Sequence, residues 1–170
     1  MKRQAMTGVR SVLGVSTLLM ALLAYAPPAA AEAGPRATGG GSTFETDGTT
    51  ERSTFVFNAI QLPSGTVIGH LVYHFRLDGF SVMMDINCLN IVASNRAIIS
   101  GTITHVTGDA PPIPIGTVGV FQVEDNGEGD GAPPDRVGDL TLFANPARNC
   151  FNRTSTVPHL DVTGNIQVQP

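Results

Sequence analysis

The feature that most constrains this chain is the alternation of apolar and polar residues in short segments separated by turn residues. Residues 54–60 (TFVFNAI) place Phe55, Phe57 and Ala59 on one face, as the period of two in a strand requires. A Pro-Ser-Gly turn follows, and residues 66–76 alternate again, which is typical of a β-hairpin. No stretch of ten or more residues carries apolar positions at helical spacing. The pattern therefore predicts an all-β fold.

About eight to nine such segments follow one another, with connections too short to hold a crossover helix, so we expect antiparallel pairing. We predict a single antiparallel β-sandwich, with a closed barrel as the alternative. The segment at residues 80–92 is too long for one flat strand, and we expect a bend near Asp85 or Asn87. Gly101 is expected to mark a bulge or a close contact.

The first residues have the layout of a secretory signal peptide. Lys2, Arg3 and Arg10 give a positive start, residues 11–26 are uncharged and apolar, and residues 29–31 are three alanines suited to a signal peptidase. The alternative is a membrane anchor, but the apolar run is shorter than the roughly 20 residues of a spanning helix. We therefore predict a secreted, extracellular protein with no membrane span in its mature part.

This interpretation divides the chain into three parts. Residues 1–31 are the predicted signal peptide, and residues 32–41 (EAGPRATGGG) are predicted to be a flexible leader because they are rich in glycine and small residues. Residues 42–170 are predicted to form one β-domain, whose size is sufficient for a hydrophobic core.

The charge of the mature part excludes two classes of partner. After Ala31 the chain carries 14 acidic residues against seven arginines and no lysine, a net charge of about −7. A nucleic-acid binder needs a basic stripe, and electrostatic docking on anionic lipid needs a basic patch. We therefore predict an unknown extracellular partner or ligand that is neither nucleic acid nor an anionic membrane.

The chain has two cysteines, Cys88 and Cys150, and both follow the predicted signal peptide. Two cysteines in an oxidising compartment usually pair, so we predict a disulfide between them. The alternative, a cysteine nucleophile, needs a histidine partner, and no local motif indicates one.

An acidic, glycine-rich segment at residues 125–139 is the strongest candidate for a metal site. Ca²⁺ prefers six to eight oxygen ligands from flexible turns. The candidate ligands are Asp125, Asn126, Glu128, Asp130 and Asp135. The segment is not an EF-hand loop, because its twelfth position is Val137 where a bidentate Glu is required. The competing interpretation is a solvated loop without a cofactor.

Other motifs do not point to catalysis, and no catalytic residue is predicted. His70 and His74 share a strand face, but they are about 13 Å apart in a strand, too far for one metal ion. The chain has no Gly-x-Ser-x-Gly motif. Asp85 is an acid within an apolar strand, which an outward face or a bulge explains.

Several short motifs are similar to those of a family of secreted bacterial β-domains. They are Gly39-Gly40-Gly41, Phe55-x-Phe57-Asn58-Ala59, the run VEDNGE at residues 123–128, and Asp135-Arg136. On these motifs the chain resembles the post-COAP-1 domains over nearly its whole mature length. The resemblance implies an extracellular, often appended β-module and carries over no catalytic residue.

These observations favour a secreted, non-enzymatic β-domain with a binding or structural role outside the cell. Two alternatives remain open at this point. One is a secreted hydrolase of unrecognised type, which would need acids converging in a cleft. The other is an extracellular module stabilised by calcium.

Overall fold

The computed structural model describes residues 34–45, 47–145, 147–152 and 159–170, and the predicted signal peptide at residues 1–31 lies outside this part. In the described part all regular structure is β-strand, which confirms the all-β prediction and the expected number of strands. No described segment forms a helix with the length and hydropathy needed to cross a bilayer. The strands are β1 (Arg36–Phe44), β2 (Glu51–Gln61), β3 (Val67–Phe75), β4 (Phe80–Ala93), β5 (Arg96–Gly108), β6 (Val118–Glu124), β7 (Arg136–Val137), β8 (Thr141–Phe143) and β9 (Leu160–Gln169).

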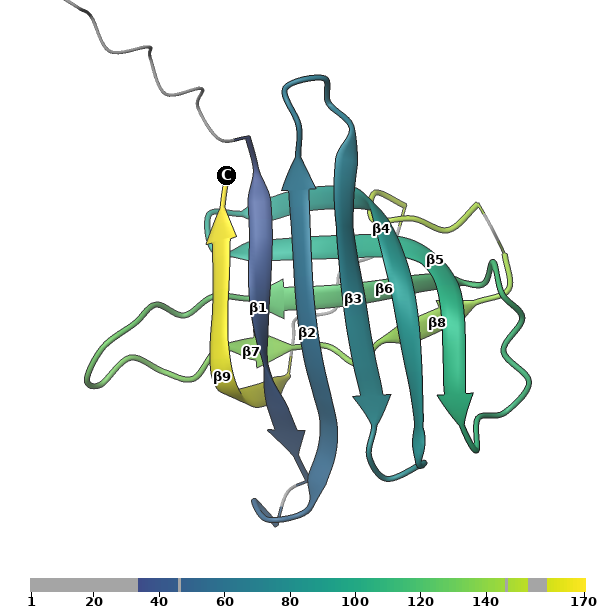
Figure 1. The fold of residues 1–170 in the computed structure, drawn as a ribbon. Coiled ribbons are helices and arrows are strands. Elements are labelled where there is room, and N and C mark those ends of the chain that lie inside the picture. The colour runs from purple at the N-terminus through teal and green to yellow at the C-terminus, as the bar shows by residue number, and fades with distance from the viewer. Residues whose placement is uncertain (1–33, 46, 146, 153–158) are drawn as a thin grey trace, which may run out of the picture. The chain divides into compact units, whose positions relative to one another are not determined.

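The strands form one antiparallel sheet that closes on itself. The order is β5-β4-β3-β2-β1-β9-β7-β6, and a further pairing of β5 with β6 completes an eight-stranded barrel. β8 is an additional strand on β6. Figure 1 shows β9, β1, β2 and β3 running across β6 in a flattened barrel of two crossing layers. The preferred prediction of a sandwich is thus corrected to its alternative, the closed barrel.

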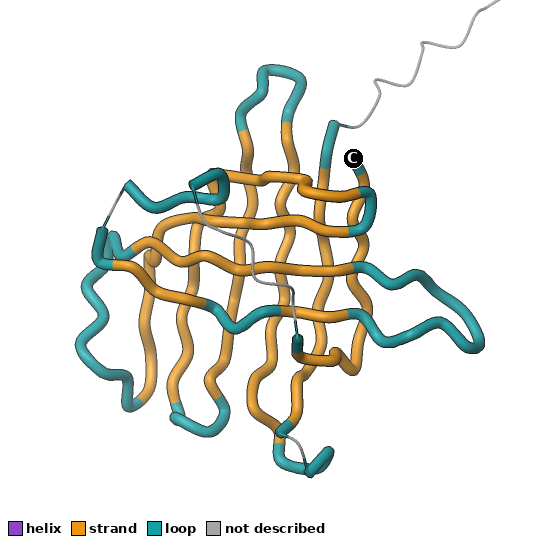
Figure 2. Tube along the Cα trace, turned by 180° about the vertical axis from the view of Figure 1, so that it is seen from behind, coloured by secondary structure: helices purple, strands orange, loops and turns teal. Residues whose placement is uncertain are grey.

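The barrel closes because two long strands belong to both layers. β4 has 14 residues and β5 has 13, and both turn from one layer into the other while staying paired (Figures 1 and 2). The register of their pairing shifts between Ile86 and Cys88, which confirms the bend expected near Asp85 or Asn87. Close contact at Gly101 is also confirmed, because a Cβ there would lie 2.0 Å from the carbonyl oxygen of Asp85. Strands that turn corners at bulges are the usual means of closing orthogonal layers.

The prediction of a flexible leader over residues 32–41 is wrong for residues 36–41, which belong to β1. This strand is paired on both sides, with β2 and with β9. Its glycines indicate close approach and not flexibility: a Cβ on Gly39 would lie 2.6 Å from the carbonyl oxygen of Asn165, and one on Gly41 would lie 2.6 Å from Cγ1 of Val162. Glycine within a strand often marks such an approach of a neighbouring backbone.

Aromatic rings fill the inside of the barrel where the two layers cross. The ring of Phe121 on β6 lies edge-on to Phe55 and Phe57 of β2 and to Tyr73 of β3, with centroids 5.3, 5.6 and 5.8 Å apart. All four side chains are buried. These separations are those of favourable aromatic pairs. The interior is therefore a packed core.

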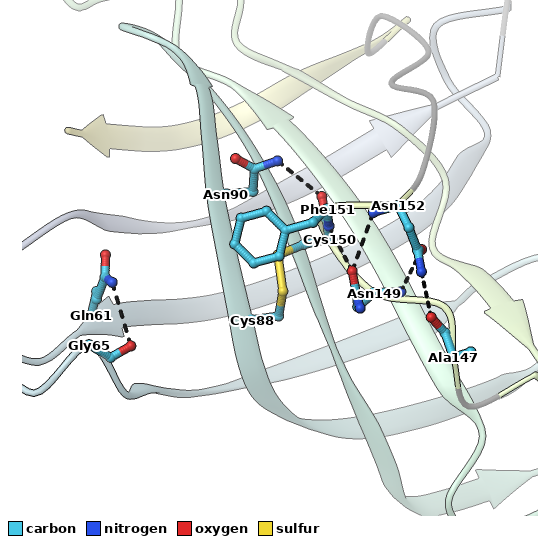
Figure 3. Close-up of a disulfide and its surroundings, with 9 residues drawn as sticks. All are labelled: Gln61, Gly65, Cys88, Asn90, Ala147, Asn149, Cys150, Phe151 and Asn152. Carbon is cyan, nitrogen blue, oxygen red and sulfur yellow. Dashed lines mark hydrogen bonds between the residues drawn. A yellow bond between two sulfur atoms is a disulfide. The ribbon is translucent and has the colours of Figure 1, made fainter.

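The predicted disulfide between Cys88 and Cys150 is confirmed (Figure 3). It joins the middle of β4 to the segment after β8, and the two residues are 62 positions apart. Both cysteines are buried, and the side chain of Asn90 donates a hydrogen bond to the carbonyl oxygen of Cys150 at 3.1 Å. Cys150 lies within a turn in which Asn149 and Asn152 bond each other, each backbone N–H donating to the other's side-chain oxygen. The crosslink thus attaches an irregular segment to the barrel wall.

We predict that replacing both cysteines by alanine lowers the free energy of unfolding by about 4 kcal/mol, because the crosslink restricts a long loop of the unfolded chain. For a domain of this size the midpoint of thermal unfolding should fall by roughly 10–15 °C. Calorimetry of the oxidised protein, the reduced protein and the double variant checks this. Two alkylatable thiols in the native protein, with a midpoint insensitive to reductant, would contradict it.

Candidate functional site

Among the predicted calcium ligands, Asp135 has a structural task. Its side chain is buried, and its Oδ2 accepts a hydrogen bond from the backbone N–H of Ile166 at 2.6 Å. Its Oδ1 accepts another from the N–H of Asn126 at 2.8 Å. The carboxylate therefore joins the acidic loop to β9.

Asp125 acts on the same strand. Its Oδ2 accepts a hydrogen bond from the N–H of Val168 at 3.0 Å, and its Oδ1 accepts one from Gly127 at 2.8 Å. The backbone carbonyl oxygen of Asp135 accepts a hydrogen bond from the N–H of Val162 at 2.9 Å. β9 pairs with β7 only at Leu160 and Asp161. Further along β9, oxygen atoms of Asp125 and Asp135 accept the backbone N–H groups that a longer neighbouring strand would otherwise accept. We call this set of contacts the carboxylate seam.

The remaining ligand candidates lie further out on the loop. Oε1 of Glu128 accepts hydrogen bonds from the side chains of Gln167 at 3.1 Å and Asn165 at 2.8 Å, and these two bonds lower the pKa of Glu128. The side chain of Asn126 donates to the carbonyl oxygen of Pro134. Asp130 is exposed near the tip. Of the five candidate ligands, four therefore make hydrogen bonds through their side chains, and Asp130 faces solvent.

Most of the acidic side chains of this loop make hydrogen bonds within the protein. Asp125, Glu128 and Asp135 use their oxygens to accept protein N–H groups, so they are not directed at one common point. Among the described residues, no group of three or more His, Cys, Asp or Glu side chains has metal-binding geometry. Calcium binding by this loop stays a prediction.

The residues considered for other chemistry lie on the outside of the barrel. His70 and Asp85 are exposed neighbours on β3 and β4, with Nδ1 3.0 Å from Oδ1. The outward face expected for Asp85 is confirmed. Nδ1 of His74 lies 2.5 Å from Oγ of Ser81, again between β3 and β4. Both pairs are cross-strand contacts on a sheet face.

A hollow that sequence reasoning missed lies where β3 ends and β2 begins. Figure 1 shows these two strand ends at the bottom of the barrel. Its volume is about 240 Å³. Arg52 enters it between two carboxylates, with Nη1 3.3 Å from Oε1 of Glu45 and Nη2 3.0 Å from Oδ2 of Asp139. At its base the hydroxyl of Tyr73 donates to Ser53 at 3.0 Å. Burial raises the pKa of Tyr73.

An apolar groove of about 560 Å³ adjoins this hollow, and the two share Phe75 and Asp78. The groove runs along the end of the barrel between the β3–β4 turn, the segment after β5 and the start of β8. Its apolar lining is Phe75, Phe80, Ala110, Pro111, Ile113, Leu140 and Leu142, and its two charged residues are Asp78 and Asp109.

The groove was not predictable because its residues come from three distant parts of the chain. The Pro-rich connection at residues 109–115 carries the clearest signal, since Ile113 and Ile115 are apolar residues in a segment that was expected to be a loop. An apolar side chain in a loop needs a partner, and Ile113 packs against the main core.

Comparison with known proteins gave no relative: no family model, no curated protein and no solved structure matches this chain. The resemblance to the post-COAP-1 domains stays a prediction.

We predict that Asp135→Asn lowers the free energy of unfolding by about 1–3 kcal/mol. The carboxylate accepts one N–H on each oxygen, from the buried Ile166 and the partly buried Asn126, whereas an amide has only one acceptor oxygen. Asp130→Asn makes the same change of charge at an exposed site and should stay within about 0.5 kcal/mol of the parent. Urea unfolding of the three proteins measures both values. Equal losses in the two variants would show that charge, and not the carboxylate seam, matters.

Proposed function

We propose that this chain is exported and that its mature domain is a non-catalytic binding module outside the cell. The observation that carries the proposal is the apolar groove. The inside of the barrel is packed with side chains, whereas about 560 Å³ at one end is open to solvent and lined mainly by apolar residues. Binding sites for small molecules are typically concave, mostly apolar and of 300–1,000 Å³.

Export is supported by two independent features. The chain begins with a positive, then apolar, then alanine-rich segment, as signal peptides do. Cys88 and Cys150 form a disulfide, which persists in oxidising compartments and is rare where thiols are kept reduced.

The charges in the hollow around Arg52 do not favour hydrolysis there. Hydrolysis by paired carboxylates requires one of them to be free to give or take a proton. Glu45 and Asp139 converge on one hollow, but both are ion-paired with Arg52. Through these ion pairs with Arg52, the two acids stabilise the start of β2. The backbone carbonyl oxygen of Arg52 also accepts a hydrogen bond from the backbone N–H of Arg76.

Export predicts that protein recovered outside the cytoplasm begins near Glu32 or Gly34. Intact-mass analysis of the secreted fraction measures this terminus. Replacing Lys2, Arg3 and Arg10 by glutamine should reduce export, because the positive start is then lost. Full-length protein retained in the membrane fraction would contradict the proposal.

Binding in the groove predicts that Ala110→Trp abolishes binding of small aromatic compounds, because the added ring occupies the groove. Ligand-observed NMR with neutral, anionic and cationic phenyl compounds measures binding, and product analysis detects any turnover. Ala93→Trp is the matched control, since Ala93 is exposed at the end of β4 remote from Phe80. Melting curves establish that both variants fold. Absence of groove binding for all three charge classes, or conversion of a compound to product, would overturn the proposed function.

A further inference from the structure

The apolar groove carries two carboxylates, Asp78 and Asp109, for which the described residues supply no cationic partner. Asp78 lies in the β3–β4 turn and Asp109 directly follows β5, and both are exposed. A hydrogen bond from the N–H of Asp109 to the carbonyl oxygen of Gly79 holds the two segments together at 3.4 Å. Neither carboxylate takes part in an ion pair within the described part of the chain.

The arginines of the described residues are engaged elsewhere. Four of them pair with carboxylates: Arg52 with Glu45 and Asp139, Arg76 with Glu51, Arg96 with Glu124, and Arg136 with Asp161. Arg36 bonds Gln169, and Arg148 lies over the ring of Phe143. The domain after residue 31 has no lysine. The negative charge on the groove is therefore not neutralised by these side chains.

The two hollows together are strongly acidic. Their lining contains four carboxylates, those of Glu45, Asp78, Asp109 and Asp139, and one guanidinium, that of Arg52, which leaves a net charge of −3. The negative charges of Asp78 and Asp109 lie beside apolar walls of low dielectric constant, so they attract cations to the groove and repel anions.

Part of the apolar lining of the groove is aromatic. The rings of Phe75 and Phe80 are stacked, with centroids 4.4 Å apart and planes at 17°. Phe75 is half-buried, so this stack reaches the groove from the core. Aromatic faces attract ammonium groups as well as apolar surface.

We propose that the groove binds a small organic cation: an apolar, preferably aromatic body that carries an ammonium group. The body lies on Phe75, Phe80 and the leucines of the groove, and the ammonium group lies at Asp78 and Asp109. This inference rests on the proposed function and adds to it the chemical class of the ligand.

Three probes of one shape test the charge selectivity: phenylpropylammonium, phenylpropanol and phenylpropanoate at neutral pH. We expect the cation to bind about tenfold more tightly than the alcohol, because each exposed charge pair contributes up to about a fivefold change in affinity. The anion should bind most weakly. NMR titration of the secreted, disulfide-bonded protein measures the three affinities, and added salt should weaken binding of the cation alone.

Variants test whether Asp78 and Asp109 are the carboxylates that bind the ammonium group. Asp78→Asn and Asp109→Asn should each weaken cation binding about threefold, and the double variant should bind cation and alcohol equally. Asp130→Asn removes the same charge from the distant acidic loop and should leave the affinities unchanged. Equal affinities for all three probes in the parent protein would overturn this inference and leave the binding module intact. Failure of every probe to bind in the groove would overturn the proposed function as well.

Discussion

The fold depends on the contact that Phe121 makes across the barrel. This ring, on β6 in the second layer, lies against Phe55, Phe57 and Tyr73 of the first layer. Each aromatic pair contributes about 0.5–1.5 kcal/mol beyond its buried area, so these three pairs together stabilise the packing of the two layers. The strand β1 has room only for small inward residues, because the backbone and side chains of β9 lie close against it. It supplies Ala37, Gly39 and Gly41 at these positions.

The same packing determines how the barrel closes. On one side β4 and β5 carry the sheet around the core through a bend at Ile86 to Cys88. On the other side β7 has only two residues, too few to pair with the length of β9. Carboxylate oxygens of Asp125 and Asp135 complete the hydrogen bonding there. Buried N–H groups left without acceptors would each be costly, so the acidic loop is needed for closure.

Local pattern predicted much of this architecture and little of its long-range geometry. The alternation in β2, β3 and β5, the bend in β4 and the pairing of Cys88 with Cys150 follow from neighbouring residues or from elimination. The strand β1 was not predicted, because a glycine-rich sequence is typical both of a flexible linker and of a strand whose backbone lies close to its neighbours. Barrel and sandwich share the same strand pattern, since they differ only in whether β5 continues to pair with β6. The barrel-end groove depends on that same closure, and so no local signal could assemble it.

The carboxylate seam also has a consequence for contacts between molecules. A strand edge with open N–H groups is a template on which another chain can add, and proteins protect such edges with charge or with short strands. Here the N–H groups of Val162, Ile166 and Val168 are occupied by an acidic loop that belongs to the same molecule. In the described part of the chain β8, with three residues, is the strand that has a neighbour on one side only. Within the described residues the barrel therefore presents few unpaired strand edges on which a second chain could add.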